Sequence, residues 1–523
     1  MDYSKKQIDS KKIVCITIVC ACIIRVILKA LMSVDVNCDE AMLSINSKSI
    51  ADSGKDIYGT SFPVYFESWA WSGQSALPTY LCAIFVKIFG YKIGVVRLPF
   101  LLLSLVSIIY FYKLNKLLFD DREAMVAILL LAICPWHIVQ QMIALDCNMF
   151  PHFFIIGLYY LVNGIKNNKS GSIYFSMIIF ALSLYCYGTS IFFIPIFLLV
   201  MGIREIKTGR IKIGTFILSI IIFTVVCTPI VLMYVVNFLK LDTIKLGVIN
   251  IQRFEYQKRS NDILFFSNNI IVQLLKNIIS LLVVFIAQAD GCLWNYVPWF
   301  GAIYIISIVF VFIGMKNKDG NEEAFVVKTW FAFAVIMGVI LNGTNINKQN
   351  IFWYVLVILC ARGIIYVVDK YGDRIQTGII ALYCILFIAF MITFTTTYNK
   401  NLKKSFTFSQ GYVESIRELK NEESIYISKD VYKTSDKYIY ALFEIGKDKD
   451  YVSDRKVMAE YKDLYEENEI FDFDKRIHGV KISDNIILEE KSYIVGKEDI
   501  EKISNIDEFD KKEFVNYYVL IKK

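Results

Sequence analysis

Two groups of acidic residues stand beside apolar runs, where a carboxylate is unusual. Asp39 and Glu40 closely follow the apolar run at 13–33, and Asp146 is the sole charged residue of 124–165. A carboxylate in such a place can act as a general base, and a second one can tune or orient it. Asp39 and Asp146 could instead be N-caps of the helices that follow them. We take Asp39, Glu40 and Asp146 as candidate catalytic residues.

A second set of candidates could bind a phosphate or a sugar. The chain has no glycine-rich phosphate loop, so a phosphate leaving group needs cationic or amide donors placed around it. Arg97, Lys348 and the neutral Gln74 are the candidates, although Arg97 could equally anchor a helix at lipid headgroups. Tyr65 belongs to a group of aromatic residues that could stack on sugar faces or serve as interface anchors.

The composition shows what must position these residues. Of the 523 residues, 56% are hydrophobic, and the charges are unevenly distributed. Residues 398–523 hold 23 Lys/Arg and 27 Asp/Glu, whereas the first 397 hold 33 and 22. The first part is too apolar for a water-soluble domain, and its positive charge lies in short connections rather than in a basic groove. The sequence therefore predicts a polytopic α-helical membrane protein and argues against nucleic-acid binding.

The apolar runs predict eleven membrane spans. A spanning helix needs about 20 mostly apolar residues. The runs that qualify lie at 13–33, 97–113, 123–143, 149–164, 172–187, 189–203, 213–236, 298–315, 324–341, 351–368 and 376–397. Two further runs, at 76–90 and 270–289, are ambiguous, so the count is about 11–13. The first of the two is short for a span and is typical of a helix lying along the interface.

Charge indicates the orientation. Lysines in the N-terminal tail and the Lys/Arg content of alternate loops place the N-terminus in the cytoplasm, provided that 76–90 and 270–289 stay on the outer side. An odd number of spans then places the C-terminal part outside the membrane. The division predicted from composition is a membrane domain at 1–397, with large outer loops at 34–96 and 237–298, and a soluble extracytoplasmic domain at 398–523.

The tail alternates helical and strand-like segments, which is typical of a small α/β or α+β domain. Helical spacing covers 412–420, and apolar segments follow at 424–428, 438–445, 486–495 and 514–521. No catalytic pattern is evident in this tail, so we expect it to select an acceptor or to pack over the active-site face. Most of the 12 cysteines lie inside apolar runs and no CxxC occurs; neither a zinc site nor a disulfide framework is supported.

The order of motifs resembles a known family. Asp39-Glu40 is followed by Gly54 and a Tyr/Pro stretch, then by Gly73-Gln74 with Leu77-Pro78, and by Arg97-Leu98-Pro99. This order resembles the membrane glycosyltransferases of the GT-C superfamily, and most nearly family 39, which includes the protein O-mannosyltransferases and the aminoarabinose transferases. Later segments are similar to motifs of the same family: Pro135-Trp136-His137 with Asp146, Asp290-Gly291 with Trp294-Asn295, and Asn345 to Asn350. The resemblance covers roughly residues 10–400.

The resemblance implies a transferase that takes a sugar from a polyprenyl-phosphate donor in the lipid bilayer. The acceptor would be a protein, a lipid or a glycan on the outer face. In this family the acid of the first loop, here Asp39, is the base that deprotonates the acceptor, and lipid phosphate leaves with inversion at the anomeric carbon. The aminoarabinose transferases carry a lysine near the position of Gln74, which raises interest in Lys348. No cofactor is required, and a divalent cation at the acidic residues stays an open question.

Two other functions are compatible with a polytopic chain. A cell-envelope polysaccharide polymerase or ligase would depend on paired outer-loop arginines such as Arg253 and Arg259, which also fit a solvated helix face. A transporter or flippase would need internal repeats and broken helices at matched positions. No repeat is evident, and ionisable residues are expected to avoid the middle of the spans. The sequence therefore favours the glycosyltransferase.

Overall fold

The computed structural model describes residues 2–32, 34–68, 73–254, 262–316, 322–405, 408–428, 431, 436–445 and 477–523. The chain forms two compact units. Unit 1 is Met1–Met32, Arg97–Leu241 and Glu255–Tyr398. Unit 2 is Ser33–Val96, Asp242–Phe254 and Asn399–Lys523.

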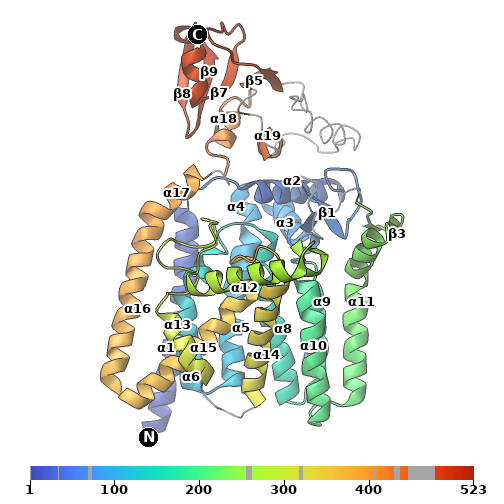
Figure 1. Ribbon diagram of the computed structural model, residues 1–523, viewed down its shortest axis with the longest axis vertical. Helices are drawn as coiled ribbons and strands as arrows, with labels where there is room; N and C mark the ends of the chain where they lie inside the picture. The colour runs from blue at the N-terminus through green and yellow to red at the C-terminus, as the bar shows by residue number, and fades with distance from the viewer. Residues whose placement is uncertain are drawn as a thin grey trace. The chain divides into compact units, whose positions relative to one another are not determined.

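Unit 1 is a bundle of helices, and every predicted span holds one of them. Most of these helices have roughly parallel axes, as α1, α10, α11 and α16 show (Figure 1). Their bounds are α1 Asp2–Leu31, α5 Leu98–Leu118, α6 Asp121–Ala132, α8 Phe150–Lys166, α9 Ser170–Ser183, α10 Ser190–Lys207, α11 Ile213–Phe238, α13 Ser307–Lys316, α14 Glu322–Ile340, α15 Asn350–Tyr371 and α16 Asp373–Thr393.

Five helical stretches among the described residues are long and apolar enough to cross a membrane: Lys11–Leu31, Ile93–Leu118, Ile213–Phe238, Asn350–Tyr371 and Asp373–Lys404. Many large apolar side chains of α11 and α16 are exposed on the surface of the unit, as expected where lipid is the solvent. The chain is a membrane protein. Its topology and orientation stay predictions.

One predicted span is wrong as a single helix. The run at 123–143 forms α6, which ends at Ala132, and a short separate helix α7, Pro135–Val139. Proline has no backbone N–H and disfavours a helical conformation in the residue before it, so Pro135 begins a new helix rather than continuing α6. The next residue, Trp136, is bonded to a distant segment of the chain. Its backbone N–H donates to the carbonyl of Ala302 at 2.8 Å.

The ambiguous run at 270–289 forms α12, Ile270–Ile286. This helix runs across the other helices of unit 1 instead of along them (Figure 1). Polar side chains on one face explain this placement, since Asn277 is buried and its amide donates to the carbonyl of Val339 and to Asn342 Oδ1, both at 2.9 Å. The run at 298–315 is helical only from Ser307 onward.

Glycines allow a very close approach of α13 and α15. A Cβ atom on Gly363 would lie 1.9 Å from the carbonyl oxygen of Phe310, and one on Gly314 would lie 2.0 Å from that of Leu359. Small residues permit such backbone contact between helices in membranes, where burial from water supplies little driving force. Gly363 and Gly314 therefore allow α13 and α15 to lie at their observed separation.

Unit 2 combines the first large segment predicted to lie outside the membrane, here called the outer segment, with the C-terminal tail. The outer segment contains α2 Cys38–Ser53, the antiparallel hairpin of β1 Tyr65–Glu67 and β2 Gly73–Ser75, α3 Ala76–Phe89 and α4 Ile93–Val96. A second hairpin, β3 Ile244–Leu246 and β4 Ile249–Ile251, joins it. Here the backbone N–H of Val64 donates to the carbonyl of Asn250 at 3.1 Å.

The tail folds around a mixed five-stranded sheet of order β6-β5-β7-β9-β8. The strands are β5 Ile425–Ser428, β6 Ile477–Val480, β7 Ser492–Gly496, β8 Phe509–Glu513 and β9 Tyr517–Lys522, with helices α17 Asn399–Lys404, α18 Tyr412–Glu418 and α19 Asp436–Ile445. Strands β6, β5 and β7 are parallel, and β7, β9 and β8 are antiparallel. The predicted small domain of helices and strands is confirmed.

The tail and α2 share one hydrophobic core. Ala41, Met42 and Ile45 of α2 are fully buried in the same cluster as Tyr412 of α18 and Tyr440 of α19. The division predicted from composition, 1–397 and 398–523, therefore separates residues that the structure groups in one compact unit. The helix that carries Asp39 is supported by the tail.

Candidate functional site

The first turn of α2 gives its two acidic residues different surroundings. Asn37 is the N-cap, and its side chain accepts the N–H of Asp39 at 2.9 Å. Glu40 is fully buried, and its Oε2 accepts the N–H of Asn37 at 3.1 Å. This reciprocal pair is a capping box. Asp39 is exposed, and the cap that we considered for it belongs to Asn37.

Gln74 holds the same turn from the β1–β2 hairpin. It is buried, and its Nε2 donates to the carbonyl oxygen of Asp39 at 3.1 Å. Its Oε1 has no hydrogen-bond partner among the described residues. Gln74 thus uses one amide N–H to position Asp39. Tyr65 lies in the paired strand, and its ring meets that of Phe254 edge-on at 6.0 Å.

Asp35 and Glu414 form a second pair of neighbouring carboxyl groups in unit 2. Asp35 Oδ2 accepts from Ser409 Oγ at 2.5 Å. Burial, together with the neighbouring Glu414 carboxyl, raises the pKa of Asp35 to about 7. Since Ser409 and Glu414 belong to the tail, the junction of the first outer segment with the tail contains a group that titrates near neutral pH.

Asp146 begins a 3-10 turn, Asp146–Asn148, in unit 1. Its Oδ1 accepts the N–H of Cys147 at 2.7 Å, and the N-cap of α8 is Met149, so Asp146 does not cap α8. The turn is fastened to the start of α15, where Asn350 Nδ2 donates to the carbonyl of Cys147 at 2.8 Å. Asn350 Oδ1 in turn accepts from Trp136 Nε1 at 3.1 Å. Asn350 is therefore bonded to both Trp136 and Cys147, which are the two ends of the segment that carries Asp146.

Lys348 lies two residues before Asn350 and is half-buried. Its Nζ donates to the carbonyl of Asn342 at 2.7 Å. Nearby, the Asp290 carboxylate accepts from the N–H of Ile346 at 2.9 Å and from Asn295 Nδ2 at 2.6 Å. The three segments that carry Asp146, Asp290 and Lys348 are thus hydrogen-bonded neighbours within unit 1.

The structure brings the candidates together in two sets. Asp39 and Gln74 are in contact within unit 2, and Asp146 and Lys348 lie on adjoining segments of unit 1. Arg97, at the start of α5, is only 5% exposed, unlike a solvent-exposed headgroup anchor. The convergence of Asp39 with Asp146 stays a prediction. Among the residues described, no group of three or more His, Cys, Asp or Glu side chains is placed to hold a metal ion.

A buried arginine that was not among the sequence candidates supports the Asp146 segment. Arg25 of α1 is fully buried within the predicted span at 13–33. Its guanidinium donates to His137 Nδ1 at 3.0 and 2.9 Å, and to the carbonyls of Ala21, Ala132 and Leu131, each at 3.0 Å. All five of its N–H groups are therefore used. Arg25 caps the end of α6 and anchors α7.

This anchoring determines which ring nitrogen of His137 carries a proton. Nδ1 accepts from Arg25, so Nε2 carries the hydrogen. Nε2 lies 3.0 Å from the Tyr354 hydroxyl and 3.1 Å from Ser107 Oγ. The Tyr354 hydroxyl donates to Ser107 Oγ at 2.9 Å, and Ser107 donates to the carbonyl of Ser104 at 2.6 Å. Every proton in this network has a fixed acceptor.

His152 extends the network to the beginning of α8. Its Nε2 lies 2.7 Å from Gln140 Nε2 and accepts from that amide, so Nδ1–H donates to the Tyr354 hydroxyl at 3.0 Å. The expectation that ionisable residues avoid the spans is wrong for Arg25. Its hydrogen bonds join α1, α5, α7, α8 and α15, so the network is suited to holding α7 and α8 in place.

Comparison with known proteins adds to this geometry. The family model of dolichyl-phosphate-mannose-protein mannosyltransferases matches residues 74–232. ArnT from Cupriavidus metallidurans, solved with undecaprenyl phosphate, superposes with a TM-score of 0.56 at 11% identity, over 96% of this chain and 97% of that one. The chain has the GT-C fold. The resemblance predicted from the order of motifs is confirmed.

A second GT-C structure agrees. AglB, the oligosaccharyltransferase of Archaeoglobus fulgidus, solved with an inhibitory peptide and a dolichol-phosphate, has a TM-score of 0.52 at 12% identity, over 92% of this chain and 69% of that one. A search of curated protein sequences finds no match. Together, the family model and the GT-C folds support a membrane glycosyltransferase. Arg259, on which the polymerase alternative partly depends, lies outside the described residues.

Proposed function

We propose that this protein is an integral-membrane glycosyltransferase that moves a sugar from a polyprenyl-phosphate donor to an acceptor outside the cytoplasm. The observation that carries the proposal is the exposed carboxylate of Asp39 on a rigidly capped helix turn, in a chain with the GT-C fold. The N-terminus lies in the cytoplasm and the tail outside, as the distribution of Lys and Arg predicts.

In the proposed reaction Asp39 accepts the proton of the acceptor hydroxyl or amine. The acceptor atom then forms a bond to the anomeric carbon, the bond from that carbon to the phosphate oxygen breaks, and polyprenyl phosphate leaves with inversion. Arg97 and Lys348 offset the charge that develops on the phosphate, and Asp146 is the second acid of the site. Hydrogen bonds of Asn37 and Gln74 with the backbone of Asp39 hold in place the turn that carries the base.

Glu40 has a positioning role in this proposal. Its carboxylate is buried and is used by the N–H of Asn37. Glutamine can replace glutamate in a capping box, so Glu40→Gln should retain transfer, whereas Asp39→Asn should abolish it. Comparing these two variants therefore distinguishes a catalytic base from a helix-capping residue, although the two residues are adjacent in the chain.

The test uses membranes that contain the full chain and a panel of radiolabelled undecaprenyl-phosphate sugars. We expect label to move from one of these donors to an acceptor with the unmodified protein and with Glu40→Gln, but not with Asp39→Asn at equal membrane content. Transfer by Asp39→Asn would refute the assignment of the base. Failure of every donor to release label would refute the donor class.

A further inference from the structure

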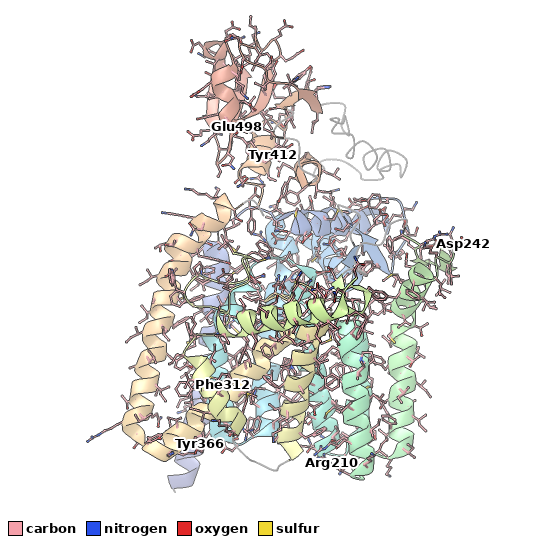
Figure 2. All side chains as sticks on the ribbon, in the orientation of Figure 1. Arg210, Asp242, Phe312, Tyr366, Tyr412 and Glu498 are labelled. Atoms are coloured by element: carbon pink, nitrogen blue, oxygen red, sulfur yellow. The ribbon has the colours of Figure 1, made fainter. Side chains whose placement is uncertain are left out.

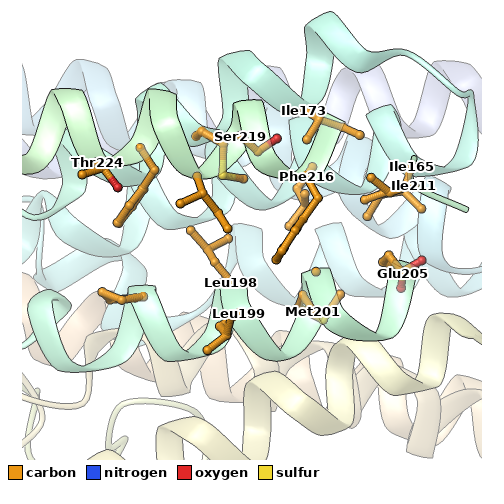
Figure 3. A pocket seen from close by; sticks show the side chains of 16 residues that line it. Ile165, Ile173, Leu198, Leu199, Met201, Glu205, Ile211, Phe216, Ser219 and Thr224 are labelled. Atoms are coloured by element: carbon orange, nitrogen blue, oxygen red, sulfur yellow. The ribbon is translucent and has the colours of Figure 1, made fainter. Parts of the chain in front are cut away.

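A cavity of about 290 Å³ lies in unit 1 between α8, α9, α10 and α11. Figure 3 shows its lining, with Glu205 at one end and Thr224 at the other. Apolar side chains form most of this lining. The polar Ser219 contributes little, because its hydroxyl donates to the carbonyl of Thr215 within its own helix at 2.8 Å. The long dimension of the cavity is therefore suited to a hydrocarbon chain.

The cavity opens sideways between two helices. Helix α11 packs along α9 and makes few contacts with α10. At this gap Leu199 of α10 is 49% exposed and Ile220 of α11 is 45% exposed, although both line the cavity. In a membrane protein such apolar exposed residues face lipid. A hydrocarbon chain can thus enter from the bilayer without crossing a polar barrier.

The end of the cavity at Glu205 is strongly basic. Glu205 is 1% exposed and is paired with Arg204 at 2.9 Å and with Arg210 at 2.7 Å. Arg210 lies at the edge of unit 1, at the same end as Tyr366 (Figure 2). The two segments here, 166–169 and 204–212, which include the last residues of α8 and α10, carry six basic residues and one acidic residue: Lys166, Lys169, Arg204, Lys207, Arg210, Lys212 and Glu205. One carboxylate cannot neutralise this positive charge, so the rim has a net attraction for an anion.

We propose that this cavity binds one acyl chain of an anionic glycerophospholipid, whose phosphate lies beside Arg210 at the Glu205 end. Basic pockets between helices at the membrane surface select anionic headgroups. The apolar lining matches the acyl chain, and the charge at one end matches the phosphate. The lateral opening lets the chain enter from the bilayer. The proposal does not rest on the glycosyltransferase activity, because the lipid is neither donor nor acceptor.

The test is photolabelling of the full chain in nanodiscs of phosphatidylcholine that contain a small fraction of phosphatidylglycerol with a diazirine in one acyl chain. We expect labelled peptides from α10 and α11. Ile220→Trp fills the opening and should reduce this labelling several-fold. Ile221→Trp is the matched control: Ile221 is the next residue, is 51% exposed and does not line the cavity.

Competition on the unmodified protein tests the headgroup even where a variant fails to fold. Unlabelled phosphatidylglycerol should displace the probe, and equal amounts of phosphatidylcholine or undecaprenyl phosphate should not. Equal competition by phosphatidylcholine would overturn the anionic preference. Stronger competition by undecaprenyl phosphate would assign the cavity to a polyprenyl lipid and overturn the proposal, as would equal labelling of the two tryptophan variants.

Discussion

Replacing Asn350 by alanine tests whether the start of α15 holds the Asp146 segment in place. The substitution removes two buried hydrogen bonds, one from Trp136 Nε1 to Asn350 and one from Asn350 to the carbonyl of Cys147. Trp136 is fully buried and Cys147 is 5% exposed, so water does not readily replace either bond. Each buried hydrogen bond contributes about 0.5–1.5 kcal/mol, so the loss of both predicts a fall of about 1–3 kcal/mol in the free energy of unfolding.

Two measurements test for this loss of stability. Unfolding of the purified full chain in detergent should occur at a lower denaturant concentration. Thiol labelling mapped by mass spectrometry should show faster modification of Cys147, because its segment is no longer tied to α15. If Asp146 acts as proposed, a displacement of about 1 Å reduces transfer on the order of a hundredfold.

Asn347→Ala is the matched control. Asn347 is three residues earlier in the same segment and is half-buried, and no hydrogen bond of its side chain is found among the described residues. Unfolding and Cys147 labelling should therefore stay close to those of the unmodified protein. Equal behaviour of the Asn350 and Asn347 variants in both assays would refute the argument that Asn350 fastens the segment.

Two further predictions concern packing and pH. Gly363→Ala places a methyl group 1.9 Å from the carbonyl oxygen of Phe310 and should lower the free energy of unfolding by about 1–3 kcal/mol or more. Gly378→Ala in α16, with open space around it, should lower it far less. Similar losses in the two variants would contradict the packing argument. Burial and the neighbouring Glu414 raise the pKa of Asp35 to about 7, so the folded chain binds an extra proton between about pH 4 and pH 7, and stability should fall as pH rises through that range. Thermal unfolding from about pH 5 to about pH 8 should show this decline, and Asp35→Asn should flatten it; an unchanged slope in that variant would assign the effect to another group.

The class of protein is decided by properties that the sequence carries locally. Apolar runs long enough for a membrane, and charges confined to their connections, determine a helical membrane domain whatever the packing. The order of short motifs was enough for the GT-C resemblance. The capping box was also readable, since Asn37 precedes Glu40 by three residues, but the same stretch of sequence is compatible with Asp39 as the cap.

The roles of single residues required the tertiary structure, because burial and hydrogen-bond partners depend on distant segments. Asp39 and Glu40 are adjacent and chemically similar, yet only Asp39 is exposed, since α2 packs against both the core of the tail and α3. Arg25 stands in the sequence as a charge within a span, and its partners other than Ala21 lie more than 100 residues away in the chain. Which charges are used for structure and which remain for chemistry is decided by these long-range contacts, and no local pattern records them.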